Sequence, residues 1–336
     1  MSRVHAKSRR LQRLIPLVPR LSLLGLSWAV VAVLAVVSTF HLAHVEPSTQ
    51  VVALISVTPW IYMLAWVSTS VGLFFHRRAL GVCSLLLVGL QLWWVVPDFN
   101  PIPHLVPLRA NEVGVRLFDA NVSQSNVNLR EIAREIQDDR AQVVTMEELT
   151  VPALFSLQAT QVMAAYPYKL VLPAFGSFGM AIWSVFPLAG DTEWYAAGHP
   201  ELRAWLELPG GRRLRIDVLH TEAPVGAGEP RRWAEQLEAI HAELAHEPRP
   251  LVAVGDLNAT WYDWHFQTLL GLGLRDAAVV AGRGWEMTWP RDQGPVVPYL
   301  RIDHVLFSPS VSLQSYALGD GQGSDHHPLL VHLGIS

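Results

Sequence analysis

The stretch 251-LVAVGDLNAT-260 joins an apolar strand pattern to a sharp turn that carries two polar side chains. Gly255 allows the chain to turn abruptly after the strand, because glycine tolerates backbone conformations that other residues avoid. Asp256 and Asn258, two positions apart, then point the same way and offer oxygen atoms to a hard cation or hydrogen bonds to a ligand. The same pattern is also typical of an ordinary turn. The other strand ends therefore decide between the two interpretations.

Polar side chains stand at the ends of five other apolar runs. In Ser324-Asp325-His326, a carboxylate for a divalent ion and an imidazole for proton transfer lie within one local turn. Six strand ends thus carry groups of catalytic type. The five others are Asn121 after 113–119, Glu147 with Glu148 after 142–146, His220 after 213–219, Asp303 at the start of 302–307, and Asp325 with His326 ahead of 329–331.

Residues 110–336 alternate between apolar runs and turn signals, and several strand candidates follow one another without a helix between them. Amphipathic helices are expected around Ile132 and around Leu237, where apolar residues recur at helical spacing. This order predicts a mixed-sheet α/β fold in which two sheets pack face to face between outer helices. The strand candidates are 113–119, 141–147, 168–173, 179–185, 203–208, 213–219, 251–255, 302–307 and 328–332.

Taken in order, these motifs resemble those of the endonuclease/exonuclease/phosphatase superfamily, and the resemblance covers nearly all of residues 110–336. It implies the DNase I-like four-layer α/β sandwich and a metal-dependent hydrolase that cleaves phosphate ester or pyrophosphate bonds. The matching positions are Asn121 after the first strand, Val-Val-x-x-x-Glu ending at Glu148, His-x-x-x-Pro at His220, Gly-Asp-x-Asn at 255–258, Arg-Ile-Asp at 301–303 and Ser-Asp-His at 324–326.

The resemblance implies a bound divalent cation, Mg²⁺ with Mn²⁺ as the alternative. Glu148 should hold this cation, with Asp325 and Asn121 beside it or in its water shell. The superfamily usually has Gln before the metal-binding Glu, whereas here Glu147 precedes Glu148. The alignment of residues 141–144 favours Glu148 as the ligand, and Glu147 remains the alternative.

Phosphoester cleavage also needs an activated water and stabilisation of the leaving oxygen. By resemblance, His326 is oriented by Asp303 and acts on the attacking water or the phosphate, and Asp256 orients that water. Asn258 and His220 hydrogen-bond the phosphate oxygens, and His220 also assists protonation of the leaving group. The sequence leaves open which histidine is the acid and which is the base.

The first 97 residues hold most of the excess apolar character of a chain that is 51% hydrophobic and only 16% charged. Three segments, at 21–43, 51–75 and 79–97, are each long enough to span a bilayer as a helix. A cleaved signal peptide is the competing interpretation of the first segment, but its apolar run is too long and two more segments follow. A buried soluble core is disfavoured, because such long uncharged runs are rare there. We therefore expect a three-helix membrane anchor over residues 1–97.

Basic residues gather on one side of these segments. Six Lys and Arg precede the first segment, two lie between the second and the third, and none lies in 44–50. The positive-inside rule then places the N-terminus in the cytoplasm and, after three crossings, residues 110–336 outside the plasma membrane. Four prolines predict an extended spacer over 98–109. Cys83 is the single cysteine, so the outer domain has no intrachain disulfide.

Charge and anchoring bear on the substrate. Of 25 Lys and Arg and 29 Asp and Glu, nine basic and two acidic residues precede residue 110, which leaves a formal charge of −11 on 110–336. Because nucleic-acid binding draws on Lys and Arg that neutralise phosphates, we expect no nucleic-acid partner.

Three spans followed by an outward-facing domain of this type resemble the membrane proteins associated with teicoplanin and vancomycin resistance. This resemblance implies a phosphatase at the outer face of the lipid bilayer that acts on a lipid-linked phosphate, namely a polyprenyl pyrophosphate such as undecaprenyl pyrophosphate. A phospholipid headgroup phosphodiesterase, an extracellular nuclease and a non-catalytic envelope sensor are the alternatives.

Aromatic residues cluster after the Gly-Asp-x-Asn turn and in the Gly/Pro-rich 282–298 loop. They could form an apolar lip for an isoprenoid chain. Packing in the core is the alternative that we favour. The residues are Trp261, Tyr262, Trp264 and Phe266 after the turn, and Trp285 and Trp289 in the loop.

Overall fold

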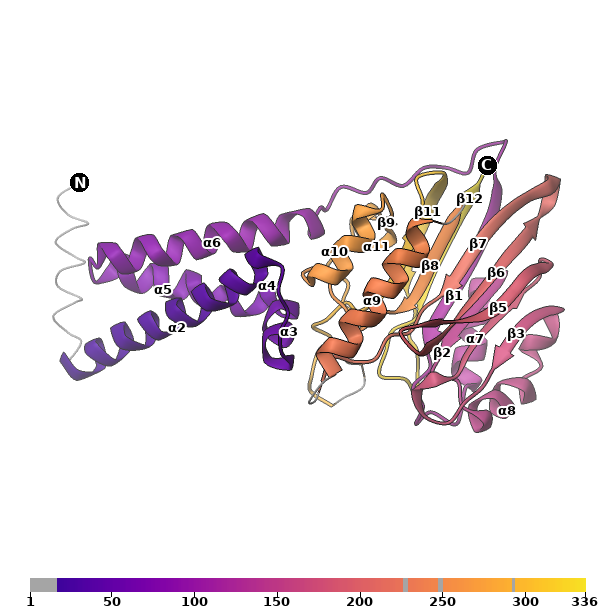
Figure 1. Cartoon of the computed structure of the whole chain (residues 1–336), viewed down its shortest axis with the longest axis horizontal. Helices are drawn as coiled ribbons and strands as arrows, with labels where there is room; N and C mark the ends of the chain where they lie inside the picture. The colour runs from indigo at the N-terminus through magenta and orange to yellow at the C-terminus, as the bar shows by residue number, and fades with distance from the viewer. Residues whose placement is uncertain (1–16, 226–228, 247–249, 292–293) are drawn as a thin grey trace. The chain divides into compact units, whose positions relative to one another are not determined.

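A computed structural model describes residues 17–225, 229–246, 250–291 and 294–336. The chain forms two compact units that divide between Pro97 and Asp98. The first unit is helical, and the second contains both β-sheets (Figure 1).

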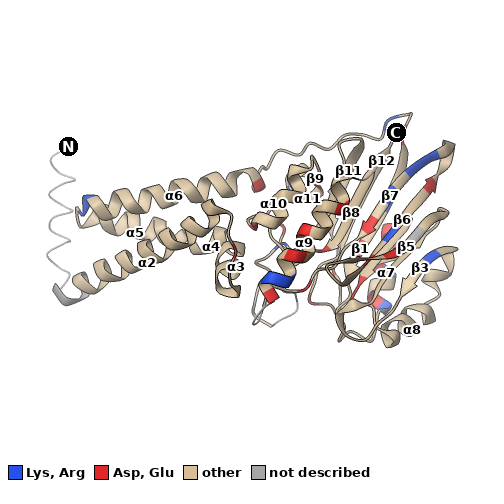
Figure 2. Ribbon diagram, in the orientation of Figure 1, with Lys and Arg blue, Asp and Glu red and all other residues tan. Residues whose placement is uncertain are grey.

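Helices make up most of the described part of the first unit. Leu21–Ala43 and Arg78–Asp98 are each long and apolar enough to cross a membrane. The charged residues coloured in this unit lie at helix ends and in connections, as lipid-facing helices require (Figure 2). The helices are α2 (Leu17–Ala43), α3 (Thr49–Ser56), α4 (Thr58–Ile61), α5 (Met63–Phe74) and α6 (Arg78–Asp98).

The second expected span is bent. Its two parts, Thr49–Ser56 and Thr58–Phe74, meet at an angle of 71°. Pro59 follows the break and has no N–H to donate to the Ile55 carbonyl, which accepts instead from the Thr58 hydroxyl at 2.6 Å. By length and composition the described residues hold two helices that could span a membrane, or three if the bent pair crosses as one span. The direction of crossing stays a prediction.

Polar side chains join the helices within the first unit. The hydroxyl oxygens of Ser38 and Tyr62 lie 2.7 Å apart. Gln91 donates to the Pro59 carbonyl oxygen at 2.9 Å and accepts from the Trp66 indole at 2.8 Å. Such interhelical hydrogen bonds suit a bilayer, where water does not compete for the polar groups.

Two six-stranded sheets form the centre of the second unit. One has the order β11-β12-β1-β2-β4-β3 and the other the order β5-β6-β7-β8-β10-β9. The pairs β1–β2 and β7–β8 are parallel. The strands are β1 (Val113–Asn121), β2 (Val143–Glu147), β3 (Tyr168–Leu172), β4 (Met180–Ser184), β5 (Leu188–Ala196), β6 (His199–Leu208), β7 (Arg212–Val218), β8 (Leu251–Asp256), β9 (Arg275–Asp276), β10 (Asp303–Phe307), β11 (Val311–Leu318) and β12 (Leu329–Ile335).

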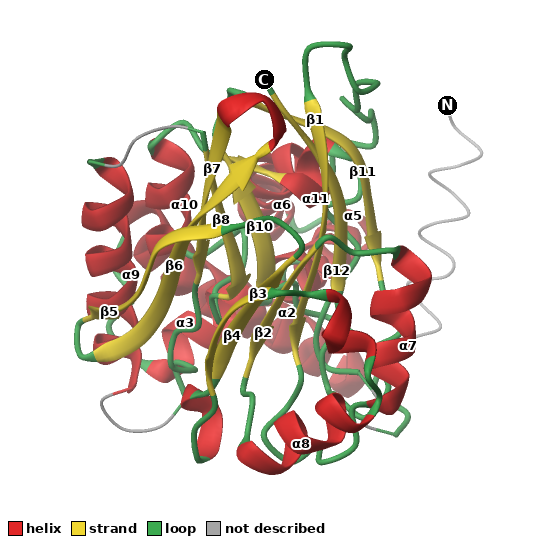
Figure 3. Cartoon of the chain, turned by 90° about the vertical axis from the view of Figure 1, so that its right-hand side faces the viewer, coloured by secondary structure: helices red, strands yellow, loops and turns green. Residues whose placement is uncertain are grey.

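The inner faces of the sheets meet in one apolar core, to which Leu117, Val143, Ile216 and Val254 contribute. A second core lies between the first sheet and the helices α7 and α8, whereas α9 and α10 lie on the side of the other sheet (Figure 3). The predicted DNase I-like four-layer α/β sandwich is confirmed. The helices are α7 (Arg130–Asp139), α8 (Val151–Ala159), α9 (Glu229–Ala245), α10 (Trp264–Gly271) and α11 (Ala277–Val280), with short 3-10 turns η1 (Val162–Ala165), η2 (Gly176–Phe178) and η3 (Pro209–Gly211).

The segment 98–109, which we expected to be a spacer, belongs to the second unit. The backbone N–H groups of His104 and Val106 donate to the carbonyl oxygens of Val280 and Leu313 at 2.7 and 3.0 Å. These bonds fix the proline-rich segment along the surface of the unit.

Candidate active site

Strand pairing brings the predicted residues of each sheet to one end. Asn121 of β1 is level with Glu147 of β2, so Glu148 follows at the same end of the first sheet. In the second sheet, Asp256 at the end of β8 is level with Asp303 at the start of β10. Asn121 Nδ2 donates to Asp256 Oδ2 at 3.0 Å, which shows that the two ends meet.

Asn121 orients two carboxylates. Its Nδ2 also lies 3.3 Å from Glu148 Oε1, while its Oδ1 accepts from the Ser123 N–H at 3.0 Å. Glu148 has a positive φ of 56°, so its side chain leaves the plane of the sheet, and its Oε2 accepts from the Gln124 N–H at 2.7 Å. The amide N–H groups of Asn121 therefore face the carboxylates, which suits a residue that positions ligands more than one that binds a cation directly.

His326 and Asp303 form a buried pair. His326 Nδ1 lies 3.1 and 3.0 Å from the two Asp303 oxygens, and its Nε2 lies 3.8 Å from Asp256 Oδ2. Burial alone would lower the pKa of His326, but the charges of Asp303 and Asp256 raise it to about 10. Burial and the Asp303 charge raise the pKa of Asp256 to about 8. The surrounding carboxylates therefore favour the charged form of His326.

The pKa of His220 is shifted in the opposite direction to that of His326. Its Nδ1 donates to the Ser177 carbonyl oxygen at 3.0 Å, so Nε2 faces the site, 3.8 Å from Glu148 Oε1 and 3.9 Å from Asp256 Oδ2. Burial lowers the pKa of His220. Its backbone N–H donates to the buried Glu201 carboxylate at 2.8 Å. The pKa values of the two histidines are thus shifted in opposite directions.

The Gly-Asp-x-Asn turn is a close crossing of two strand ends. Gly255 has a φ of 133°, and a Cβ there would overlap the Leu219 carbonyl oxygen. Beyond it, the Asn258 backbone N–H donates to Asp256 Oδ1 at 2.8 Å, and Asn258 Nδ2 donates to the Thr221 carbonyl oxygen at 2.9 Å. This turn places Asn258 between β8 and the chain that leaves His220.

Asp325 lies at the edge of this group. Its Oδ2 accepts from the Trp289 indole N–H at 3.2 Å, and its charge contributes to the raised pKa of His326. The preceding residue, Ser324, donates its hydroxyl to the Asn121 carbonyl oxygen at 2.7 Å and thereby ties this loop to β1. Among the predicted site residues, Asp325 is thus the one whose carboxylate is hydrogen-bonded to the 282–298 loop, through Trp289.

The donor set fits a divalent cation. Ligand atoms of Asp256, Asp303 and His326 lie within 4.8 Å of one another, and the carboxylate of Glu148 is linked to Asp256 through Asn121. Hard cations such as Mg²⁺ prefer carboxylate oxygens. Because Asp303 is already engaged with His326, Glu148 and Asp256 are the carboxylates best placed to receive such an ion.

Sequence reasoning missed a buried acidic pair beneath the site. Asp119 and Glu147 lie on the inner face of the first sheet, and Asp119 Oδ1 accepts from the Thr145 hydroxyl at 2.5 Å. The Glu147 carboxyl group interacts with that of Asp119 and has no other hydrogen-bond partner among the described residues. Burial raises the pKa of Glu147 well above its usual range and that of Asp119 to about 7. The sequence signal for this pair was that Glu147 stands where the superfamily usually has Gln.

The aromatic residues after the turn pack mostly inside. Tyr262 and Phe266 are buried, and the Tyr262 hydroxyl donates to Asp98 at 2.9 Å. The exposed aromatics near the site are instead Phe175 and Phe178, which sequence reasoning did not select. They follow β3 in a Gly-rich turn, and their exposure has no signature in the apolar pattern.

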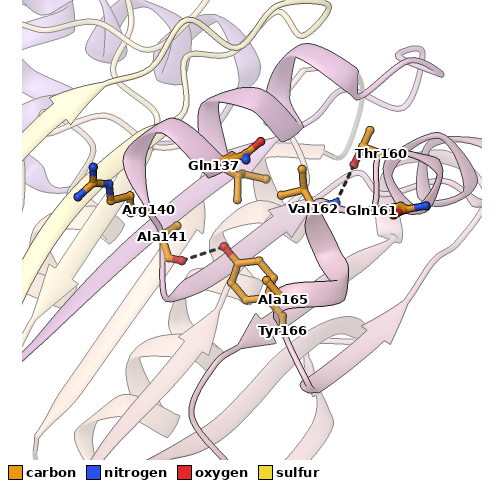
Figure 4. Close-up of a pocket in the computed structure, with 9 residues that line it drawn as sticks. Gln137, Arg140, Ala141, Thr160, Gln161, Val162, Ala165 and Tyr166 are labelled. Carbon is orange, nitrogen blue, oxygen red and sulfur yellow. Dashed lines mark hydrogen bonds between the residues drawn. The ribbon is translucent and has the colours of Figure 1, made fainter.

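A pocket of about 450 Å³ lies on another flank of the second unit (Figure 4). Arg140, Gln161 and Tyr166 are among its lining residues, and Tyr166 donates its hydroxyl to the Ala141 carbonyl oxygen at 2.8 Å. None of the predicted site residues lines this pocket, so it is separate from the candidate active site.

Residues 115–326 match the Endonuclease/Exonuclease/phosphatase family. The chain belongs to this family. The match includes every predicted site residue, from Asn121 to His326. Comparison with curated proteins gives no match.

Several solved structures share the fold of the second unit. Humanized D. rerio TDP2 is 18% identical, with a TM-score of 0.55 over 66% of this chain and 98% of that one. The human Nocturnin catalytic domain is 18% identical, with a TM-score of 0.53 over 69% of this chain and 100% of that one. An endonuclease/exonuclease/phosphatase from Beutenbergia cavernae is 17% identical, with a TM-score of 0.52 over 66% and 72%. At such identities the likeness concerns the fold.

Proposed function

We propose that this chain is a membrane-anchored, divalent-metal-dependent phosphoesterase that acts on a lipid-linked phosphate at the outer membrane face, with a polyprenyl (undecaprenyl) pyrophosphate as the favoured substrate. The observation that carries the hydrolase assignment is the approach of two unlike histidines to one carboxylate. His220 Nε2 and His326 Nε2 lie 3.9 and 3.8 Å from Asp256 Oδ2. A proton acceptor and a proton donor thus face the same space.

Glu148 would hold the cation with help from Asp256, and Asp325 approaches from the rim. Bound there, Mg²⁺ or Mn²⁺ supplies positive charge to the phosphate oxygens. Asn121 keeps the two carboxylates oriented through its amide N–H groups. A helix of the same chain that enters the bilayer would tether the second unit to a lipid surface, which supports a lipid substrate.

The histidines divide the proton transfers. His326 holds a proton, because Asp303 and Asp256 stabilise its charged form. It therefore donates to a phosphate or leaving-group oxygen. His220 is neutral, with its Nδ1 hydrogen engaged by Ser177, so its Nε2 lone pair accepts a proton from the attacking water.

The test is phosphate release from undecaprenyl pyrophosphate by the purified full chain in liposomes. We expect release with Mg²⁺, none with EDTA, and a loss of at least about 100-fold in Glu148→Ala and His326→Ala. Lys169→Ala, on β3, is the control and keeps activity. Undiminished release in EDTA would contradict the metal dependence, and no release from any phosphoester would favour the non-catalytic sensor. Cleavage of DNA, RNA or a phospholipid diester in place of the pyrophosphate would favour the corresponding alternative.

The outward location of the site has its own test. A reporter fused after Ser336 that is active only outside the cytoplasm agrees with the proposal. A reporter active only in the cytoplasm contradicts both the orientation and an envelope substrate.

A further inference from the structure

The loop between β3 and β4, residues 173–179, presents two exposed aromatic side chains. Phe175 is 89% exposed and Phe178 is 44% exposed. The Phe178 ring packs at one edge against His199, with ring centroids 5.2 Å apart. A phenyl ring as exposed as that of Phe175 gains free energy from any apolar partner that covers it.

Hydrogen bonds fix this loop to the candidate active site. The Ser177 carbonyl accepts from His220 Nδ1, so one of the two residues between the phenylalanines contacts a histidine of the site directly. At the base of the loop, the Leu149 N–H donates to the Gly179 carbonyl at 2.9 Å and the Leu149 carbonyl accepts from Ala174 at 3.1 Å. Leu149 follows Glu148, so both anchoring points adjoin site residues.

Two neighbouring loops carry exposed apolar residues as well. Val127 lies in the loop after β1, whose Gln124 N–H donates to Glu148. Val225 lies in the loop that begins at His220. Each of three loops that contact or contain site residues thus carries an exposed apolar side chain.

We propose that Phe175 and Phe178 bind the apolar chain of a lipid phosphate whose head group occupies the candidate active site. This inference rests on the proposed function and names the residues that would select for a lipid chain. Exposed aromatics could also stack on nucleic-acid bases. The formal charge of −11 on residues 110–336 and the apolar helices of the same chain favour the lipid.

A loop held at both ends loses little conformational freedom when a ligand covers its tip, so the contact contributes mainly to binding. Covering one phenylalanine is worth about 10- to 100-fold in affinity. This gain requires a substrate long enough to reach the loop. The chemical step should not change, because the head group contacts neither ring.

The experiment compares prenyl pyrophosphates of five and fifteen carbons that share one head group, with the full chain in detergent. For Phe175→Ala combined with Phe178→Ala, we expect kcat/KM to fall about tenfold or more on the fifteen-carbon substrate, chiefly through KM, and to stay unchanged on the five-carbon one. When Phe175→Leu replaces Phe175→Ala in this double variant, part of the lost kcat/KM on the fifteen-carbon substrate should return. Tyr168→Ala is the matched control, since Tyr168 is 40% exposed at the opposite end of the same sheet.

Each outcome separates the two proposals. Equal activity of variant and wild type on both chain lengths overturns the lipid-binding role while the phosphatase assignment stands. An equal loss of kcat/KM on both substrates would show that the loop serves to hold His220, and it would also overturn the lipid-binding role. If the variant loses cleavage of single-stranded DNA but not of either prenyl pyrophosphate, the rings bind bases. If the wild type releases phosphate from neither substrate, the proposed function fails and this inference with it.

Discussion

Glu147 and Glu148 are adjacent acidic residues with opposite surroundings. Glu147 is fully buried between the sheets beside Asp119, whereas Glu148 turns outward toward Asn121. The positive φ of Glu148 separates them, because it ends the alternation of the strand. The motif alignment favoured Glu148, but strand periodicity kept Glu147 as an alternative, since it does not say at which residue the strand ends.

Replacing Glu147 by Gln should stabilise the protein without removing activity. Burial raises the pKa of Glu147, so its contribution to stability is full below the unfolded pKa of about 4.3 and is lost as pH rises toward the folded value. A neutral Gln avoids this loss. The gain over wild type should grow above pH 4, by at most about 1.4 kcal/mol per pH unit, as measured by thermal unfolding of the full chain in detergent at several pH values.

Glu148→Gln is the matched control for this prediction. It should abolish metal-dependent activity while changing the unfolding temperature little, because Glu148 is partly exposed. The opposite pattern, with loss of activity in Glu147→Gln alone, would identify Glu147 as the metal ligand.

At the scale of elements, the strands that carry the site could be predicted closely. Expected ranges 213–219, 251–255 and 302–307 correspond to β7, β8 and β10. The strands β5, β9 and β11 had no counterpart among the expectations, and all three lie at sheet edges. Edge strands are less buried, so their apolar alternation is weaker.

The crossing at Gly255 should be intolerant of any side chain. Gly255→Ala combines a strained φ with overlap of the Leu219 carbonyl at the end of β7, which should cost about 3 kcal/mol and displace the adjacent Asp256. Both the unfolding temperature and the turnover number should fall. Gly271→Ala, at the end of α10 with open space around it, should be neutral or slightly stabilising. Equal behaviour of the two variants would show that the crossing tolerates a Cβ.

At the scale of the whole molecule, a buried ionic network defines where the second unit begins. Arg301 donates to Asp98 and Asp276 at 2.6 Å each, and His304 Nδ1 lies 2.8 Å from Asp276. Arg301 and Asp98 are both buried. Since Arg301 precedes Asp303 by two residues, this network supports the strand that carries a site residue.

We therefore expect residues 98–336 to fold as a stable unit and residues 110–336 to be much less stable. Removal of Asp98 leaves the buried Arg301 with one carboxylate fewer, and breaking a buried pair costs about 3–5 kcal/mol. Urea unfolding of the two fragments should show this difference, and Asp98→Asn in the longer one should reproduce most of it. Arg109→Ala, which removes a largely exposed side chain, should change the stability by less than about 0.5 kcal/mol. Equal urea midpoints for the fragments would show that 98–109 is only a spacer.

The sequence by itself determined the four-layer fold and the family and selected the candidate residues from Asn121 to His326, because strand periodicity and short motifs are local properties. It also determined the apolar helices of the first unit, since length and lack of charge suffice for that.

Only the tertiary structure decided which of these groups meet. A hydrogen bond between the two sheets joins Asn121 to Asp256. Burial and neighbouring charges then gave His220 and His326 opposite protonation tendencies. These pKa shifts depend on groups that are distant along the chain and close in space. Local sequence patterns do not show which groups become neighbours.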